Sequence, residues 1–297
     1  MKAMVTGANG FLGAALIDKL VENGYEVIAL DVSFANQKFE DSALITKYEI
    51  SVDEIDSMYT ETIENQVDMF YHLAWRGVNG KEKVDPIIQM ENIRMMLQAA
   101  KFAKKIGVKK FLCAGTVAER AVESLPGLPT TSGGMMYGSA KYCAGIMLET
   151  YSKNVNLNSV WMQFSNIYGP KNKTGNLISY TLTELANNRE ASFGPANQPY
   201  DFIYVDDLIS AVYKLGLANT TKYSYFIGSG KPKILKEYLY RVGEVCGKED
   251  LICIGARNDD GIRYTVDMFD TSDLVADIGE YVSGDFEEHL KYTVEHF

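Results

Sequence analysis

Short apolar runs and longer amphipathic segments alternate along the first half of the chain. Near-continuous apolar runs are typical of strands buried on both faces of a parallel sheet, and four occur here: residues 2–6, 26–30, 67–74 and 109–114. Residues 11–20 and 86–106 instead repeat their apolar side chains with the spacing of an α-helix. This alternation predicts an α/β fold with a doubly wound parallel sheet, which binds its ligand outside the carboxyl ends of the strands.

The second half of the chain has a less regular pattern. Residues 177–187 and 235–246 show helical periodicity, whereas residues 191–205 read as irregular chain that contains a strand. Pro195 and Pro199 bracket a loop in that stretch, which we expect to lie over the substrate. No linker, repeat or low-complexity stretch divides the chain, so 297 residues with 46% hydrophobic content predict one large unit or two lobes.

A glycine-rich turn joins the first apolar run to the first helical segment. Gly7, Gly10 and Gly13 follow that run at once, and a turn this tight needs residues without a Cβ atom. Unpaired N–H groups and the helix dipole at such a junction can hold a pyrophosphate. Asp31 follows the second apolar run, near the spacing at which a carboxylate binds the adenosine ribose and repels a 2′-phosphate. These four residues predict a dinucleotide cradle that prefers NAD to NADP.

A second signal, Tyr137-x-x-x-Lys141, lies far downstream. The two side chains are one helical turn apart, so the Lys141 ammonium can approach the Tyr137 phenol. A free phenol has a pKa of about 10, and the ammonium together with a positive nicotinamide ring would bring this pKa toward neutrality. Tyr137 could then accept and return an alcohol proton, while Thr116, just after the fourth apolar run, hydrogen-bonds the same oxygen. The pattern predicts hydride transfer at an alcohol carbon, with Thr116, Tyr137 and Lys141 as catalytic residues.

Composition narrows the choice of partners and of metal chemistry. A formal charge of −10 without any block of basic residues makes nucleic acids and anionic membranes poor partners. The three histidines and four cysteines show no metal-ligand spacing, so we expect no metal site. We expect Cys113 and Cys143 to be buried, and His72 to have a structural role. An apolar strand that begins at residue 2, and the absence of any apolar run of transmembrane length, favour a cytoplasmic protein.

Taken together, these motifs resemble the extended short-chain dehydrogenase/reductase family, and within it the sugar-nucleotide epimerase/dehydratase group. The matching stretches run over nearly the whole chain: residues 6–13, 72–74, the Thr116 region, 137–141, 166–170, 201–207 and 227–230. The resemblance implies a Rossmann-type NAD-binding domain over residues 1–166 and a smaller, partly interleaved C-terminal substrate domain over residues 167–297. It also implies a nucleoside-diphosphate sugar substrate and a homodimer formed through the helix at 86–106 and the helix that carries Tyr137.

The resemblance also assigns residues to the two ligands. The implied cofactor residues are Gly7, Asn9, Gly10, Phe11, Leu12, Gly13, Asp31, Ser51, Val52, Leu73, Ala74, Tyr137 and Lys141. Among these, Ser51 and Val52 would flank the adenine. The implied substrate residues are Thr116, Asn166, Gln198 and Tyr200.

Several positions depart from the family pattern. The 4,6-dehydratase branch carries an Asp-Glu pair directly after the catalytic threonine, whereas Val117 and Ala118 stand here and Glu119 comes one residue late. This departure argues against dehydratase chemistry. Gln163 and Tyr200 replace arginines of many members, and the second arginine commonly meets a substrate phosphate. Phosphate recognition is then altered, weaker or shifted to another cation, for which the candidates are Lys171, Lys173, Lys231, Lys233, Arg257 and Arg263.

Three functional hypotheses follow. The leading one is an NAD-dependent epimerase that transiently oxidises a hexose ring carbon, with C4 as the expected position. The same residues serve an NAD(P)H-dependent reductase of a 4-keto sugar. Asp31 favours the epimerase, whereas the missing arginine and Trp75, which could wall the pocket or pack in the core, argue against a standard hexose 4-epimerase. The third hypothesis is a non-catalytic NAD sensor, against which the presence of both Tyr137 and Lys141 argues.

Overall fold

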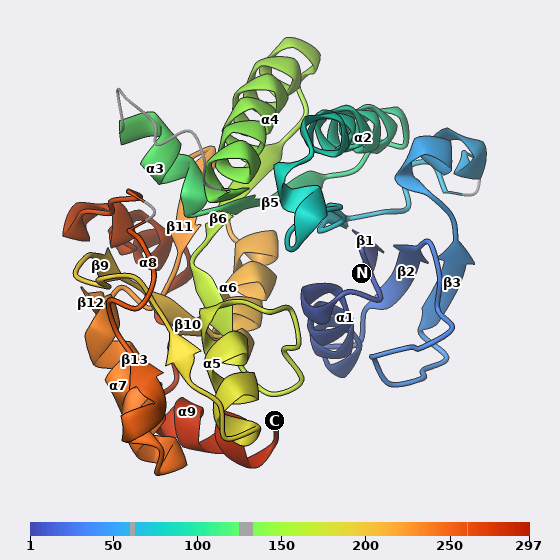
Figure 1. The fold of residues 1–297 in the computed structure, drawn as a ribbon. Helices are drawn as coiled ribbons and strands as arrows, with labels where there is room; N and C mark the ends of the chain where they lie inside the picture. Colours follow the sequence, from blue (N-terminus) through green and yellow to red (C-terminus); the bar gives the residue numbers. More distant parts are fainter. Residues whose placement is uncertain (60–62, 125–132, 260) are drawn as a thin grey trace.

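A seven-stranded sheet forms the centre of the computed structural model, which describes residues 1–59, 63–124, 133–259 and 261–297. The strand order is β11-β6-β5-β4-β1-β2-β3, and every neighbouring pair is parallel (Figure 1). These strands are β1 (Lys2–Thr6), β2 (Glu26–Asp31), β3 (Ile45–Glu49), β4 (Met69–His72), β5 (Lys110–Thr116), β6 (Ser159–Phe164) and β11 (Ser224–Ile227). The chain runs outward from β1 to β3 and then crosses back to β4, so a topological switch point lies between β1 and β4, where such folds bind ligands.

The remaining elements are helices and short strand pairs. The helices are α1 (Phe11–Glu22), α2 (Pro86–Lys105), α3 (Ala118–Ser124), α4 (Gly133–Val155), α5 (Leu177–Ala186), α6 (Val205–Leu217), α7 (Leu235–Cys246), α8 (Ser272–Ile278) and α9 (Phe286–Glu295), with 3-10 turns η1 (Val52–Met58), η2 (Lys81–Val84), η3 (Glu249–Leu251) and η4 (Val266–Phe269). The short strands pair as β7 (Asn166–Tyr168) with β10 (Phe202–Tyr204), β9 (Pro199–Tyr200) with β12 (Lys233–Ile234), and β8 (Ala191–Ser192) with β13 (Ile252–Cys253). In Figure 1, helices α5, α7 and α9 and strands β9, β10, β12 and β13 gather on one side of the molecule, away from β1 to β3.

Helices cover both faces of the main sheet. Helices α2 and α4 lie side by side on one face, and α1 and α6 pack together on the other (Figure 1). The strands serve both layers because successive side chains of a strand point to opposite faces. On β1, Ala3 and Val5 belong to the core cluster that includes α1, whereas Met4 belongs to the cluster that includes α2. This double burial accounts for the apolar runs of the sequence and confirms the predicted doubly wound α/β fold.

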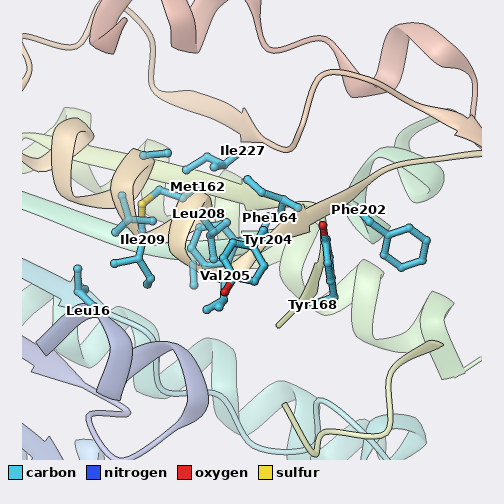
Figure 2. Close-up of a cluster of buried hydrophobic side chains, with 14 of the residues drawn as sticks. Leu16, Met162, Phe164, Tyr168, Phe202, Tyr204, Val205, Leu208, Ile209 and Ile227 are labelled. Atoms are coloured by element: carbon cyan, nitrogen blue, oxygen red, sulfur yellow. The ribbon is translucent and has the colours of Figure 1, made fainter. Parts of the chain in front are cut away.

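One apolar core joins the main sheet to the short strands and to the helices that follow β6. Figure 2 shows this core, where Phe164 at the end of β6 and Tyr168 of β7 lie among side chains of β10, α6 and β11. Asp201 is fully buried nearby, and its carboxylate accepts hydrogen bonds from the Ser165 hydroxyl (2.6 Å) and the Ser229 backbone N–H (2.9 Å). Because Ser165 follows β6 and Ser229 follows β11, this carboxylate fixes the chain at the carboxyl ends of both strands.

The structure corrects the sequence pattern in a few places. The pattern does not predict β3, β6, β11 or α6. Strand β3 lies at the edge of the sheet and four of its five residues are exposed, so it lacks an apolar run. Cys113 is buried in β5 as predicted, but the prediction that Cys143 is buried is wrong, because this thiol lies on the exposed side of α4.

Candidate active site

Two glycines set the geometry of the turn between β1 and α1. Gly7 has a φ of +69°, in the left-handed region, and a Cβ atom there would lie 2.8 Å from the backbone nitrogen of Ala74. A Cβ atom on Gly13 would lie only 2.0 Å from the carbonyl oxygen of Gly7. The turn, the start of α1 and the chain after β4 can therefore approach one another only because both residues lack a side chain. This close approach forms the cradle that the sequence predicts.

The first turn of α1 is open to an anion. Gly10 is the N-cap residue, no side chain caps the helix, and no acidic residue lies in the first turn. The N–H groups of this turn and the positive end of the helix dipole therefore suit the pyrophosphate of a dinucleotide. The residues present here fit NAD.

Asp31 lies at the end of β2, beside the glycine turn. Its carboxylate accepts hydrogen bonds from the backbone N–H groups of Asn9 (2.8 Å) and Val32 (2.7 Å). The backbone N–H of Ile50 donates to the carbonyl oxygen of Asp31 (2.8 Å), which holds the chain before residues 51–52 against the end of β2. Asp31 and the two residues predicted to flank the adenine therefore lie at the same edge of the sheet.

A cavity of about 340 Å³ lies where the glycine turn meets the carboxyl ends of β4, β5 and β6. Its lining includes many predicted site residues: Gly7, Gly10, Phe11, Leu12, Gly13, Leu73, Thr116, Tyr137, Lys141 and Asn166. The other predicted site residues are not part of this lining: Asn9, Asp31, Ser51, Val52, Ala74, Gln198 and Tyr200. The structure thus brings the glycine turn and all three predicted catalytic side chains to one space.

Lys141 is held firmly at the base of this cavity. Its side chain is buried, and its Nζ donates a hydrogen bond to the carbonyl oxygen of Ala114 in β5 (2.6 Å). The same Nζ lies 3.7 Å from the ring centroid of Trp75 and 5.9 Å from that of Tyr137. A cation over an indole face is stabilised electrostatically, so Trp75 and the β5 carbonyl together fix the ammonium next to the phenol.

Trp75 also forms part of the cavity wall, one of the two roles that the sequence leaves open for it. Its indole Nε1 donates a hydrogen bond to Oε1 of Gln89 on α2 (2.9 Å). Its ring meets the Tyr137 ring edge-on, with centroids 6.3 Å apart and an interplanar angle of 86°. This anchored indole limits the rotamers that the Tyr137 ring can adopt.

Burial shifts the proton affinities of the two central side chains in opposite directions. It lowers the pKa of Lys141 to about 8, although the Cys113 thiol and the Glu119 carboxylate raise it. It raises the pKa of Tyr137, the Glu119 carboxylate adds to this rise, and the Thr116 hydroxyl opposes it. The sequence predicts a Tyr137 pKa near neutrality; in the protein alone the phenol is instead stabilised in its neutral form, because burial disfavours the phenolate. The predicted shift toward neutrality therefore depends on the positive charge of the nicotinamide ring.

Glu119 does not take the place of the dehydratase carboxylates. It is buried on α3, and its Oε1 accepts a hydrogen bond from the Thr116 backbone N–H (2.6 Å). It is absent from the cavity lining, and among the described residues of that lining none is Asp or Glu. Val117 and Ala118 leave the usual acid and base positions without a carboxylate, which supports the sequence-based argument against dehydratase chemistry.

The two positions where relatives have arginine are engaged in local hydrogen bonds. Tyr200 donates its hydroxyl to Oδ1 of Asn166 (2.9 Å), and Nδ2 of Asn166 donates to the carbonyl oxygen of Asp201 (3.1 Å). Gln163 accepts a hydrogen bond from Nε of Arg120 (2.9 Å). The six cations considered as substitutes for phosphate binding do not line the cavity: Lys171, Lys173, Lys231, Lys233, Arg257 and Arg263.

Polar residues after β7 line the cavity although the sequence pattern does not single them out. They are Asn172, Thr174 and Asn176. Nδ2 of Asn176 donates to the carbonyl oxygen of Ile167 (2.6 Å), and Oδ1 of Asn172 accepts the hydroxyl proton of Thr174 (2.7 Å). The only signal in the sequence is a cluster of Asn, Thr and Gly between a proline and the next helix, which by itself indicates a loop.

His72 has the structural role expected of it. It is buried at the end of β4, its Nδ1 lies 2.8 Å from the Thr6 hydroxyl, and burial lowers the pKa of its ring to about 3. Within the described ranges, no group of three or more His, Cys, Asp or Glu side chains is placed to hold a metal ion. In the same ranges, no helix has the length and apolar character needed to span a membrane.

Comparison with known proteins places the chain in a family. Residues 3–228 match the model of the NAD dependent epimerase/dehydratase family. The chain belongs to this family. It is therefore an NAD-dependent enzyme of the extended short-chain dehydrogenase/reductase type, as its motifs predict.

Relatives in this family share the fold over nearly the whole chain. A putative UDP-glucose 4-epimerase of Methanocaldococcus jannaschii is 27% identical over 248 residues, which make up 79% of each protein. The UDP-glucose 4-epimerase of Mycolicibacterium smegmatis is 24% identical over 265 residues, 84% of each protein. The crystal structure of UDP-glucose 4-epimerase from Thermotoga maritima, 25% identical, matches with a TM-score of 0.81 and covers 100% of this chain and 98% of that one.

Proposed function

We propose that this family member is an NAD-dependent epimerase that acts at C4 of a nucleoside-diphosphate hexose. The observation that carries the proposal is the convergence of Tyr137, Thr116 and Lys141 with the glycine turn on one cavity. A hydride carrier, a proton acceptor and a hydroxyl that binds the same oxygen are what oxidation of a secondary alcohol requires. The two relatives described above that are named UDP-glucose 4-epimerases point to the same substrate class.

The residues of the chain divide the chemistry among them. NAD, when held in the cradle, would supply the hydride acceptor and donor for the sugar carbon. Tyr137 accepts the proton of the C4 hydroxyl as that carbon becomes a ketone, and Thr116 donates a hydrogen bond to the same oxygen. The Lys141 ammonium, fixed by the β5 carbonyl and Trp75, stabilises the phenolate that Tyr137 must form. After the keto sugar rotates in the cavity, Tyr137 returns the proton, and the hydroxyl is restored with the opposite configuration at C4.

A reductase of a 4-keto sugar is the second candidate, and one observation favours it. Tyr200 and Gln163 stand where many members of the family have arginine, and both side chains are engaged in local hydrogen bonds. The nucleotide phosphates would then be held less tightly than in a standard hexose 4-epimerase. Weak binding of the nucleotide sugar suits an enzyme that reduces its substrate once, exchanges its cofactor and releases the product.

An isotope experiment separates these two functions. The purified protein is incubated with UDP-glucose carrying deuterium at C4, without added cofactor, and the products are resolved by chromatography and mass spectrometry. The epimerase should form UDP-galactose that retains the deuterium, because the same hydride is removed and returned. No conversion without added NADH or NADPH, of this sugar or of others with different nucleotides, would contradict the epimerase.

We propose further that the protein is a homodimer. On the face formed by α2 and α4, four large apolar side chains are exposed: Ile87 (61%), Met90 (65%), Ile146 (50%) and Met147 (43%). A hollow of about 490 Å³ between the two helices, lined in part by Leu97 and Tyr151, gives this face a shape into which a second copy could pack. Sedimentation should give twice the mass of one chain, and Met90→Glu should shift the protein toward monomer.

A further inference from the structure

We infer that Glu119 is a positioning residue, whose buried carboxylate holds the backbone of Thr116 and supplies the negative charge that keeps Lys141 an ammonium. The inference rests on the proposed function, because it concerns the proton transfer at Tyr137. Glu119 does not line the active cavity, so it would act on the substrate only through its neighbours.

The surroundings of Glu119 consist of hydrogen-bond donors. Its side chain is 1% exposed; Oε1 accepts the Thr116 N–H (2.6 Å), and Oε2 accepts the Trp161 indole N–H (2.7 Å) and the Gln163 amide N–H (3.1 Å). The Gln163 amide cannot reverse freely, because its Oε1 accepts a hydrogen bond from Nε of Arg120 (2.9 Å). A protonated acid would have to place its own proton among these donors, so the hydrogen bonds favour the ionised carboxylate.

The strand beneath this group is shaped to admit it. A Cβ atom on Gly115 of β5 would lie 2.7 Å from Oε1 of Glu119 and 2.5 Å from Nε1 of Trp161. Any larger residue would displace Glu119 and Trp161, which are hydrogen-bonded to each other. Gly115 immediately precedes Thr116, so the carboxylate is packed directly against the backbone that carries the catalytic hydroxyl.

Hydrogen bonds and charge act on Glu119 in opposition to its burial. Burial raises the pKa of its carboxyl above the usual value, and the bonds from Gln163, Trp161 and Thr116, together with the charge of Lys141, oppose this rise. The Lys141 Nζ lies 6.0 Å from the ring centroid of Trp161, whose indole N–H binds Oε2 of Glu119, and the carboxylate raises the pKa of Lys141, which burial has brought down to about 8. Without that negative charge, more of the Lys141 side chain would be neutral at physiological pH.

Charged and titratable groups face Tyr137 and Lys141 from several elements. They are Glu119 on α3, Cys113 on β5, His72 on β4 and Lys83 on η2. Burial lowers the pKa of His72 to about 3 and raises that of the Cys113 thiol to about 12, so both are neutral near pH 7. Lys83 places its Nζ 5.3 Å from the Tyr137 ring centroid and adds positive charge. Of these described groups, Glu119 is the one that carries a negative charge.

The first test follows Lys141 directly and needs no substrate. Trp75 is one of two tryptophans in the chain, and the Lys141 Nζ lies 3.7 Å from its ring centroid, so its fluorescence should change when the ammonium loses a proton. A fluorescence change with pH that the natural protein shows and Lys141→Met lacks is assigned to Lys141. Its midpoint should lie near pH 8 in the natural protein and about 1 pH unit lower in Glu119→Gln.

Glu123→Gln is the matched control, because it removes the same charge from an exposed position one turn further along α3. Its midpoint should equal that of the natural protein. An unchanged midpoint in a folded Glu119→Gln protein would overturn the assigned charge role, whether or not the protein proves to be an epimerase.

Glu119→Asp tests the positioning role and remains informative if Glu119→Gln does not fold. Aspartate keeps the charge but is too short to reach both Thr116 and Trp161. We expect the fluorescence midpoint to stay near that of the natural protein while kcat falls about tenfold at unchanged KM, because Thr116 is no longer held in place. Full kcat in this variant would overturn the positioning role.

Discussion

The two ends of the active cavity are built in different ways. At the cofactor end, the backbone makes the site: Gly7 and Gly13 allow the turn, the helix and β4 to approach, and the first turn of α1 offers free N–H groups. At the sugar end, side chains make the site, among them Thr116, Tyr137 and Asn166. A site made by backbone tolerates few substitutions and gives one function, whereas a site made by side chains can change its substrate through single replacements.

This difference explains why the family is easier to establish than the substrate. The glycine turn suits a dinucleotide, and the Tyr137–Lys141 pair suits proton transfer at any secondary alcohol. Tyr200 and Gln163 stand where the family pattern has arginine in many members, and each has a local hydrogen-bond partner in this chain. The sugar end therefore departs from the family pattern at two positions, whereas the glycine turn matches it.

Replacing the phenol should produce the largest effect on the sugar end. Tyr137→Phe removes the proton acceptor but keeps the ring that meets Trp75, so turnover should fall by about 10²- to 10⁴-fold. Cofactor content, measured after denaturation, should stay the same. Tyr142→Phe is the control, because Tyr142 lies on the same helix but lines a different hollow. Equal activity of the natural protein and Tyr137→Phe would remove Tyr137 from the mechanism.

A methyl group in the glycine turn should damage the cofactor end. In Gly13→Ala the new Cβ atom would lie 2.0 Å from the Gly7 carbonyl oxygen, so we expect a loss of about 1–3 kcal/mol in unfolding free energy together with lost NAD binding. Gly10→Ala is the graded control, since its Cβ atom would lie 3.0 Å from the same oxygen. Denaturant unfolding and calorimetry measure both quantities. Equal losses in the two variants would show that the close approach at Gly13 is not what forms the cradle.

The pH dependence of activity should report the protonation state of Lys141, which lies between the cofactor end and the sugar end of the cavity. Burial lowers the pKa of Lys141 to about 8, and its role requires the protonated ammonium. Activity should therefore fall about tenfold per pH unit as the pH rises above that pKa, because the ammonium is lost. Lys141→Arg should lack this decline, since a guanidinium stays charged throughout. A decline at the same pH in Lys141→Arg would assign it to another group.

The smallest effect should come from Tyr200. Tyr200→Phe removes the hydroxyl that donates to Asn166, which should raise KM for the nucleotide sugar by about 2- to 10-fold with little change in kcat, the equivalent of one hydrogen bond. Tyr200→Arg introduces the guanidinium that many members of the family have at this position, and it should lower KM instead. Steady-state kinetics distinguish the two directions. A KM that is unchanged in both variants would place the substrate phosphates elsewhere.

Features that neighbouring residues determine could be predicted from the sequence, whereas features that depend on contacts between distant segments could not. The strand, turn and helix around Gly7 follow from neighbouring residues, and Tyr137 and Lys141 share a helix face because of their spacing alone. Gln198 lies outside the cavity lining because its position depends on pairing between β9 and β12, which are far apart in the chain. Strand β3 has no apolar run, so only its partner β2 identifies it.

Glu119 shows the same limit at the catalytic residues. From the sequence it is a carboxylate one residue away from a dehydratase position, and nothing nearby marks it as buried. Its partners Trp161 and Gln163 are more than 40 residues away. Predicting its role requires the tertiary structure.

We expect the backbone-built cradle to retain NAD while the side-chain-built end recycles the hydride. The most direct test of this division is to denature freshly purified protein and identify any released nucleotide by chromatography and absorbance. We expect stoichiometric NAD that appears only on denaturation. A protein that is empty as purified and that binds and exchanges NADH or NADPH would contradict the claim and favour the reductase.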